Sequence, residues 1–472
     1  MIKRIGRRTI EEKKIFPPPR PIKLYKGATR IVKIEKLDDY YKGVAYIGEQ
    51  KYTVRGAIKG ETETVEVIDV NRKVGVECKF LSSENPSADR VTPICDRFYE
   101  CGNCDLMHIS IQSQLKLKKQ NLSAVLGVPE NKINDVVSVN ELYYRNKVHL
   151  VFGEKDGKIN LGFFDETTHA VTPIEKCYLH DKWLYKLIKR ILMWARATRV
   201  EAYKPWNGKG QMRFVAARCL GENIMVTLVS RKGAKLKSLD KLYESLKLDF
   251  KSVSLFTSEN DGKSAMVLAG KIRHVAGDTR LKGSLCGIDF GLSPDSFFQV
   301  NERAIERIYS DIFAYVKKGG AKNVVDCFSG IGITSAMFAK SGVSVTSIEI
   351  VPSAVSDAEK LAEANGVKDK IKFIRGDVNK VLPKLDKSHK YTFFVDPPRS
   401  GLGEAVCLSI IGFAPNEIIY LSCNPQTLAD DLKFLTRHGY KLVSVTPYDM
   451  FPNTKHIETL VILKNNNSKI LR

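Results

Sequence analysis

The spacing of hydrophobic residues changes along the chain. Residues 29–80 form short β-branched runs such as IVKIEKL and TVEVIDV, broken by glycine and charged turns, which predicts a small all-β barrel. Residues 109–126 have helical apolar spacing, and residues 143–285 mix strand-like runs with one helical stretch, as in an α+β domain. From about residue 294, apolar strands alternate with helix-length segments, which predicts a parallel, doubly wound α/β sheet.

These changes divide the chain into four predicted regions. We expect a flexible basic arm over residues 1–27, a β-barrel over 28–84, a central α+β domain over 90–285 and a Rossmann-like α/β domain over 286–472. No apolar run approaches the ~20 residues of a membrane helix, and the N-terminus lacks the apolar core of a secretory signal. We therefore expect a cytoplasmic monomer with no membrane association.

The positive charge of the chain is unevenly distributed. The formal net charge is +22, yet residues 286–472 hold 23 Lys and Arg against 20 Asp and Glu, so residues 1–285 carry an excess of 19. A lysine-rich proteome would spread the charge evenly. The asymmetry therefore indicates an enzyme core joined to a region that binds a polyanion such as RNA.

Three predicted strand ends in the last region carry residues suited to a nucleoside cofactor. The first strand ends in DCFSGIG, residues 326–332, where glycines such as Gly330 let the backbone approach a ligand closely. Glu349 ends the next strand, about 20 residues on, where an acid typically binds ribose hydroxyls. Gly376 and Asp377 end the third strand, from which a side chain can reach an adenine edge.

Two cofactors compete for this site. A nicotinamide dinucleotide motif needs a third glycine, and Ser335 occupies that position. The tetrapeptide DPPR, which begins at Asp396, suits a methyltransferase, where it ends the fourth strand beside the donated methyl group. S-adenosylmethionine is therefore the preferred cofactor.

Cys423 ends the next predicted strand, EIIYLSC, and its position at the tip of the strand indicates a covalent role. C5 of uracil cannot attack a sulfonium methyl directly, but a thiolate that adds to C6 converts the ring into an enolate with a nucleophilic C5. A base must then remove the C5 proton, and Glu458 is the candidate carboxylate. The alternative for a lone cysteine is inert packing, and the same thiol chemistry also serves cytosine-5 methylation.

At this point the chain resembles a known family. The segments SPDSFFQVN (residues 293–301), DCFSGIG, DPPRSGL, LSCNPQTLADDL and MFPNTKHIETL are similar, in that order, to those of the RNA uridine-5-methyltransferases. The resemblance covers the C-terminal half and implies a seven-stranded methyltransferase sheet. It implies that Cys423 is the nucleophile and Glu458 the base. It also implies that the cofactor is contacted by Gln299, Phe328, Glu349, Asp377 and Asp396.

Four of the ten cysteines form a spaced set. Cys95, Cys101 and Cys104 stand close together, and Cys177 follows 73 positions after Cys104. Four thiolates can hold zinc or an iron–sulfur cube, and the three-plus-one spacing favours the cube modestly. Family members that methylate bacterial ribosomal RNA carry a similar set and bind a 4Fe–4S cluster, which the resemblance therefore implies here, although Asn103 stands where glycine is usual.

The N-terminal half adds to the resemblance. The stretch that contains GAIKGETETVEV is similar to a TRAM domain, a small RNA-binding barrel, and residues 143–147 (YYRNK) also match the family and are candidates for RNA contact. Relatives that modify transfer RNA are generally shorter and lack both the barrel and the cysteines, so 23S ribosomal RNA is the favoured substrate. The alternatives are a transfer RNA methyltransferase and a non-catalytic RNA-binding assembly factor.

Overall fold

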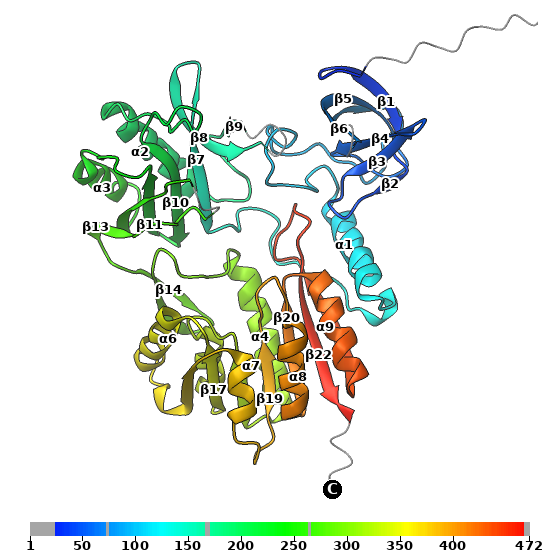
Figure 1. The fold of residues 1–472 in the computed structure, drawn as a ribbon, viewed down its shortest axis with the longest axis vertical. Coiled ribbons are helices and arrows are strands. Elements are labelled where there is room, and N and C mark those ends of the chain that lie inside the picture. The colour runs from blue at the N-terminus through cyan, green and yellow to red at the C-terminus, as the bar shows by residue number, and fades with distance from the viewer. Residues whose placement is uncertain (1–23, 72–74, 166–169, 263–265, 467–472) are drawn as a thin grey trace, which may run out of the picture. The chain divides into compact units, whose positions relative to one another are not determined.

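The protein is described by a computed structural model over residues 24–71, 75–165, 170–262 and 266–466 (Figure 1). The predicted basic arm, residues 1–27, lies outside the described residues except for its last four. The chain divides into two compact units, Met1–Pro86 and Ser87–Arg472. The predicted end of the barrel, residue 84, lies two residues before the end of the first unit.

The first unit is a single six-stranded sheet that wraps around its own core. Its strand order is β1-β5-β6-β4-β3-β2, with one parallel pair, β4 and β6, among antiparallel neighbours. Alternate residues of the long strands point inward, as the period of two in the sequence predicts. The strands are β1 (Thr29–Lys33), β2 (Lys36–Leu37), β3 (Gly43–Ile47), β4 (Gln50–Arg55), β5 (Thr62–Asn71) and β6 (Gly75–Ser83).

The second unit contains a central α+β layer. Its seven-stranded sheet has the order β13-β12-β11-β10-β7-β8-β9, and α2 and α3 pack together beside it. The elements are β7 (Lys147–Lys155), β8 (Lys158–Phe164), β9 (Val171–Pro173), α2 (Trp183–Ala197), β10 (Met212–Leu220), β11 (Asn223–Ser230), α3 (Leu239–Lys247), β12 (Ser252–Glu259) and β13 (Arg273–Gly277).

The rest of the second unit is the predicted doubly wound sheet. Its order is β18-β17-β16-β19-β20-β22-β21, parallel except for β22, which runs antiparallel to both of its neighbours. The strands are β16 (Asn323–Cys327), β17 (Ser344–Glu349), β18 (Ile371–Arg375), β19 (Thr392–Val395), β20 (Glu417–Ser422), β21 (Tyr440–Tyr448) and β22 (Glu458–Asn465). The helices are α4 (Glu302–Gly319), α5 (Ile333–Lys340), α6 (Pro352–Ala364), α7 (Val378–Val381), α8 (Gly403–Phe413) and α9 (Pro425–Arg437). The predicted fold class, a Rossmann-like α/β methyltransferase sheet preceded by β and α+β parts, is confirmed.

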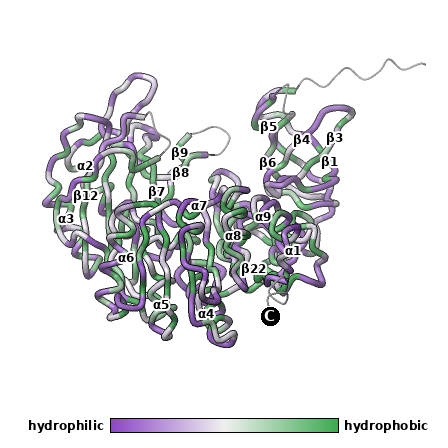
Figure 2. Tube along the Cα trace, turned by 60° about the horizontal axis from the view of Figure 1, so that its bottom comes forward, coloured by the Kyte–Doolittle hydropathy of each residue, from purple (hydrophilic) through white to green (hydrophobic). Residues whose placement is uncertain are grey.

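Hydrophobic residues gather on the inner strands, and hydrophilic residues on the outer turns (Figure 2). The parallel strands β16, β19 and β20 are almost wholly buried because helices cover both of their faces. None of the described helices is both long and apolar enough to span a membrane.

A β-hairpin and a helix both connect the regions on the two sides of the predicted boundary at residue 286. The strands β14 (Leu281–Leu285) and β15 (Ile288–Leu292) form one hairpin, whose turn contains that boundary. The helix α1 (Ile111–Leu126), predicted within the central domain, packs instead against α9 of the parallel sheet. A fully buried ion pair fixes it there, with Lys118 Nζ 2.6 Å from Asp449 Oδ1. The position of α1 depends on this ion pair, and the apolar spacing of the helix does not show that Lys118 is buried rather than exposed to solvent.

Candidate functional site

A cavity of the parallel sheet lies where its strand order reverses. The chain passes outward from β16 to β17 and β18, and then returns to β19 on the other side of β16. Ligands of open α/β sheets bind at the carboxyl ends of the strands at such a point. The cavity there has a volume of about 320 Å3, and five of the predicted cofactor residues line it: Gln299, Phe328, Gly330, Glu349 and Asp396.

The turn after β16 takes a backbone conformation that few side chains tolerate. Phe328 has a φ of 63°, in the left-handed region, and Gly330 follows with a φ of 56°. Gly332 begins α5, and a Cβ atom added there would lie 2.8 Å from Ala358 Cβ on α6. The glycines therefore let the turn lie close to both the cavity and the neighbouring helix.

Glu349 is held rigidly at the end of β17. Its Oε2 accepts the backbone N–H of Gly330 at 3.0 Å, and its Oε1 accepts those of Ile350 and Val351 at 2.8 Å each. Each carboxylate oxygen has further lone pairs. Glu349 can therefore bind ribose hydroxyls while the same carboxylate fixes the turns after two strands.

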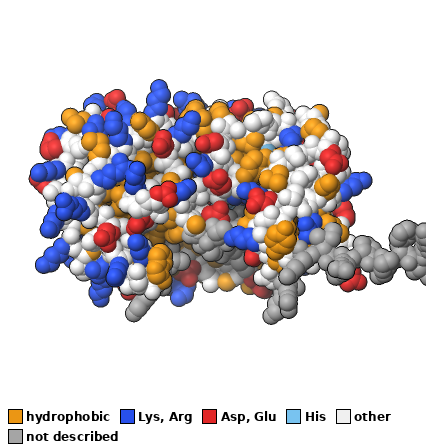
Figure 3. All heavy atoms as spheres, turned by 90° about the horizontal axis from the view of Figure 1, so that it is seen from above, with side chains coloured by type: hydrophobic (Ala, Val, Ile, Leu, Met, Phe, Trp, Pro, Cys, Tyr) orange, Lys and Arg blue, Asp and Glu red, His pale blue; other side chains and the backbone are white. Residues whose placement is uncertain are grey.

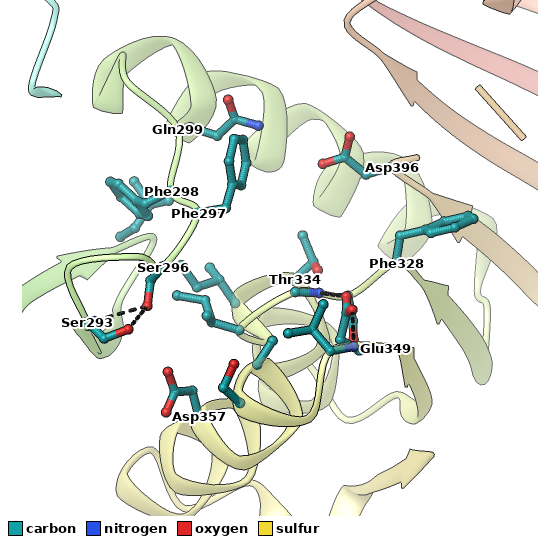
Figure 4. A pocket seen from close by; sticks show the side chains of 18 of the residues that line it. Ser293, Ser296, Phe297, Phe298, Gln299, Phe328, Thr334, Glu349, Asp357 and Asp396 are labelled. Carbon is teal, nitrogen blue, oxygen red and sulfur yellow. Dashed lines mark hydrogen bonds between the residues drawn. The ribbon is translucent and has the colours of Figure 1, made fainter. Parts of the chain in front are cut away.

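The opposite wall comes from the segment before α4. Gln299 and Phe297 point into the cavity, Asp396 lies across from them, and Asp357 lies at the far end (Figure 4). Residues 293–301 of this segment were recognised from the sequence as a family motif, but only Gln299 was predicted to contact the cofactor. Phe297 and Asp357 were not predicted, and the 74% exposure of Phe297 is a signal that only the structure supplies.

Asp377 does not line the cavity. It stands two positions after the end of β18, where its side chain caps α7 by accepting the backbone N–H of Asn379 at 3.0 Å. This bond leaves further lone pairs on the carboxylate, so the contact of Asp377 with the adenine edge stays a prediction.

Cys423 and Glu458 meet at the end of an antiparallel ladder. The pairing of β20 with β22 ends at Ser422 opposite Thr459, so the next residue on each side is Cys423 and Glu458. Opposed residues of such a pair have Cβ atoms about 5 Å apart. The two residues are 35 positions apart in the sequence, and this strand register brings them together.

Electrostatic coupling joins this pair to the cavity. Burial, then the carboxylates of Glu458 and Asp396, raise the pKa of the Cys423 thiol to about 11, while Arg399 opposes the shift. The pKa of Glu458, a buried residue, lies well above its ordinary value because of burial and Asp396. Burial and Asp326 raise the pKa of Asp396 to about 7. The site thus gathers acidic groups that disfavour one another's ionised forms.

The loop before Glu458 rests on the segment that carries three of the four cysteines. The backbone N–H groups of Asp105 and Leu106 both donate to the Asn453 carbonyl at 3.0 Å, and Asp105 Oδ2 accepts the N–H of Lys455 at 2.9 Å. Gln114 of α1 also bonds Asn453. The position of the candidate base therefore depends on the cysteine segment.

All four predicted ligands, Cys95, Cys101, Cys104 and Cys177, line one small cavity. Burial, then the thiolates of Cys177, Cys101 and Cys95, raise the pKa of the Cys104 thiol well above its ordinary value, which favours its protonated form in the free protein. Across the described ranges, no three His, Cys, Asp or Glu side chains are arranged to hold a single metal ion. A cube instead takes one thiolate on each iron. The donor set fits a cluster, but the space, about 20 Å3, would have to widen.

A second cavity, of about 300 Å3, borders the cysteines and gathers cations. Arg145 and Lys147 line it. Arg218, 6% exposed, lies opposite Lys147 in the sheet; its Nη2 donates to the Ser296 carbonyl at 3.3 Å, whereas its Nη1 has no hydrogen-bond partner in the described part of the chain. Burial, Arg218 and Arg145 lower the pKa of Lys147 to about 8, and burial lowers that of Arg218 to about 10 despite the nearby Glu302. Sequence reasoning named Arg145 and Lys147, within residues 143–147, as candidates for RNA contact, but it missed Arg218, which stands on β10 opposite Lys147.

Comparison with known proteins identifies the family of the chain. The sequence model of the tRNA (uracil-5-)-methyltransferase family matches residues 110–466. The chain belongs to this family. It is 33% identical to an uncharacterised RNA methyltransferase of Clostridium tetani, over 94% of this chain and 97% of that protein, and 34% identical to one of Caldanaerobacter subterraneus, over 90% and 95%. The predicted enzyme class, a methyltransferase of RNA uracil that uses S-adenosylmethionine, is thereby confirmed.

One solved structure resembles nearly the whole chain. It is the tRNA (uracil-54, C5)-methyltransferase of Pyrococcus abyssi in complex with S-adenosyl-L-homocysteine, with a TM-score of 0.76 and 26% identity. The similarity covers 92% of this chain and 99% of that one. A transfer RNA enzyme can therefore share almost the full architecture, so the length of the chain does not argue for 23S RNA as we expected.

Proposed function

We propose that this methyltransferase modifies C5 of a uridine in RNA through a covalent intermediate on Cys423. The observation that carries the proposal is the strand register that pairs Cys423 with Glu458 beside Asp396, at the edge of the cofactor cavity. S-adenosylmethionine supplies the electrophilic methyl group. Gln299, Phe328, Gly330, Glu349 and Asp396 would hold it, because they line the cavity at the ends of the strands.

Cys423 and Glu458 serve the steps on either side of methyl transfer. The Cys423 thiolate forms a bond to C6 of the uracil, and the electron pair of the C5–C6 double bond moves onto C5 and the O4 carbonyl. C5 forms a bond to the methyl carbon, whose bond to the sulfonium sulfur would break and leave S-adenosylhomocysteine. C5 then carries both its original hydrogen and the new methyl group. The Glu458 carboxylate takes the C5 proton, the double bond reforms, and the C6–S bond breaks to regenerate the thiolate.

A trapped intermediate tests this mechanism. Without a carboxylate at position 458, the C5 proton stays and the thiol cannot leave. We expect Glu458→Gln to accumulate RNA bound to the protein through a bond that survives denaturing electrophoresis, and Cys423→Ala to form none. Glu404→Gln, an exposed glutamate on α8, is the matched control and should turn over normally. An adduct that forms equally in the Cys423→Ala variant would rule out this thiol as the nucleophile.

The favoured substrate is 23S ribosomal RNA, because the four cysteines resemble those of family members that methylate ribosomal RNA. Transfer RNA is the second candidate, favoured by the Pyrococcus abyssi enzyme. Nucleoside mass spectrometry after incubation with each unmodified RNA distinguishes them. A gain of 5-methyluridine in one sample identifies the substrate, and 5-methylcytidine would point to the cytosine reaction. Binding without any product would favour an assembly factor.

We also propose that Cys95, Cys101, Cys104 and Cys177 hold a 4Fe–4S cluster with a structural role. Support comes from the four thiols around one cavity and from the contacts of their segment with the loop before Glu458. Aerobically purified protein should be brown and contain equal amounts of iron and acid-labile sulfide. If the protein instead contains one zinc ion and no sulfide, the four cysteines bind a single metal ion and the cluster proposal is wrong.

A further inference from the structure

A large cavity on the central sheet plays no part in the chemistry above. Its volume is about 790 Å3, within the range of pockets that hold small molecules. Strands β7 to β10 and the loop after Ala202 contribute most of its lining, which combines aromatic and cationic side chains: Phe164, Tyr203, Lys204, Trp206, Arg213 and Phe214. Figure 3 shows Lys and Arg side chains interleaved with hydrophobic ones over the face of this α+β layer.

Trp206 is displayed on this cavity by a tightly bonded loop. It is 79% exposed, the most exposed large hydrophobic side chain in the described part of the protein. The N–H of Lys204 donates to the Lys209 carbonyl at 2.8 Å, and a Cβ atom at Gly210 would lie only 2.0 Å from the Ala202 carbonyl oxygen. The backbone therefore closes behind the indole and leaves it directed toward solvent, although burying it would be favourable.

Arg213 forms the cationic side of the same cavity. Its guanidinium lies over the Tyr203 ring at 4.8 Å and the Phe214 ring at 5.5 Å, and its Nη1 donates to the Asn260 carbonyl at 3.2 Å. Stacking on two rings and an anchoring bond fix the planar group. Arg231 supports the Trp206 loop from behind, with Nε donating to the Gly210 carbonyl at 2.9 Å.

The charge around this surface identifies its partner. The cavity lining includes Arg97, Lys155, Lys204 and Arg213 against Glu100 and Glu154, and the exposed Lys209 extends the same side. Glu154 is paired with Lys204 at 2.8 Å. An excess of cations beside exposed rings matches an anionic polymer with aromatic groups, which is unpaired RNA: its bases stack on aromatic rings and its phosphates bind cations.

We propose that the surface formed by Trp206, Tyr203 and Arg213 binds an unpaired nucleotide of the RNA substrate, away from the uridine that is methylated. This inference rests on the proposed function, because it assumes an RNA substrate. Trp206 stacks on the base, and Lys204, Lys209 and Arg213 bind the flanking phosphates. The surface acts on affinity and leaves the reacting atoms untouched.

Tryptophan substitutions test the proposal with two probes, a ten-nucleotide single-stranded oligouridylate and the full-length RNA substrate. We expect Trp206→Ala to raise Kd for both probes by about five- to a hundredfold, the range for loss of one stacked base. Trp206→Phe should retain most of the affinity. Leu248→Ala, which shortens a side chain that is 73% exposed elsewhere, is the matched control and should bind as the wild type does.

Two further readouts separate this inference from the proposed function. RNA should quench the fluorescence of Trp206, and the quenching should disappear in Trp206→Ala although Trp183 and Trp194 remain. At saturating RNA, kcat should be unchanged while KM rises with Kd. Normal methylation and an unchanged Kd in Trp206→Ala would overturn the inference. A protein partner would then be the alternative occupant of the cavity. Quenching without methylation of any RNA would retain the inference and remove the proposed function.

Discussion

Two regions of the second unit bury like charges, and they do so with opposite signs. At the end of β20 and the start of β22, burial raises the pKa values of Cys423 and Glu458, and Asp396 raises both further. Beside the cysteines, burial, then Arg218 and Arg145, lower the pKa of Lys147. Buried like charges destabilise a protein unless a group of opposite charge joins them. Under the proposed function, each region receives such a partner, the sulfonium cofactor in the first and RNA phosphates in the second.

The comparison teaches that the two regions are incomplete in the free protein for the same physical reason. Each region lowers the stability of the free protein and raises its affinity for a charged ligand. Removing one charge from either region should therefore weaken function and strengthen the fold. The four predictions below test that relation, and the largest expected effect comes first.

Loss of the thiol should abolish the reaction. We expect Cys423→Ala to lower kcat by at least about 10⁴-fold, because C5 cannot be activated without addition at C6. The measurement is 5-methyluridine formed per enzyme by mass spectrometry, with cofactor affinity as a check of folding. Cys286→Ala, which removes another half-buried thiol, is the control and should be fully active. A Cys423→Ala variant with more than a few per cent of normal turnover would contradict the acidic region's proposed role.

The pH dependence should follow the raised pKa values. The thiol, with a pKa raised to about 11, and Glu458, whose pKa is also raised, must both lose protons to react. Their reactive forms increase as pH rises, and each contributes up to about tenfold per pH unit, so kcat/KM for RNA should climb by about ten- to a hundredfold per unit between pH 6.0 and 7.5. This range lies below the pKa of about 8 for Lys147, so the basic region stays charged. A rate that falls with pH would require a protonated group instead.

Removal of a cation should weaken RNA binding. We expect Lys147→Met to raise Kd for the RNA substrate by about tenfold at low salt and to reduce the salt dependence of log Kd by about one unit. Lys241→Met, a substitution on α3, is the control for total charge. An unchanged salt dependence of log Kd would show that Lys147 contacts no phosphate. It would contradict the assignment of RNA phosphates to the basic region.

Removal of a buried acid should stabilise the fold. A carboxyl with a raised folded-state pKa stabilises the protein only at low pH, and that stability is lost as pH rises above the ordinary range of glutamate. Glu458→Gln has no such loss, so we expect its free energy of unfolding at pH 8 to exceed that of the wild type by about 1–3 kcal/mol. The difference should shrink at pH 5. Urea denaturation at both pH values measures it, and equal stability at pH 8 would indicate that Glu458 is compensated by a partner.

The acidic region and part of the basic region could be predicted from the sequence. Asp396 and Cys423 follow apolar parallel strands whose carboxyl ends lie at one edge of the sheet, so they converge by topology alone, whereas Glu458 begins the antiparallel strand β22. Arg145 and Lys147 were named within residues 143–147 as candidates for RNA contact. Arginine is usually exposed, so nothing in the sequence marks Arg218 as a buried partner of Lys147.

The same reasoning explains the smaller differences. Asp377 follows a strand as predicted, but its carboxylate caps a helix, a choice that depends on the local turn. Helix α1 was predicted from its apolar spacing, whereas its partner depends on Lys118 reaching Asp449 across 331 positions of sequence. Trp206 was not singled out because an isolated tryptophan in a glycine-rich loop carries no periodic signal.

The position of β22 has a consequence for synthesis on the ribosome. This strand lies between β20 and β21 although it follows both in the chain. While residues 440–448 have emerged from the exit tunnel but residues 458–465 have not, β21 has no neighbouring strand in the sheet and Cys423 has no base beside it. Under the proposed mechanism, the nascent enzyme would therefore be unable to complete a methylation cycle on RNA that it meets during translation. Catalytic competence would arise only when the last interior strand inserts, so a non-local folding step would control the onset of activity.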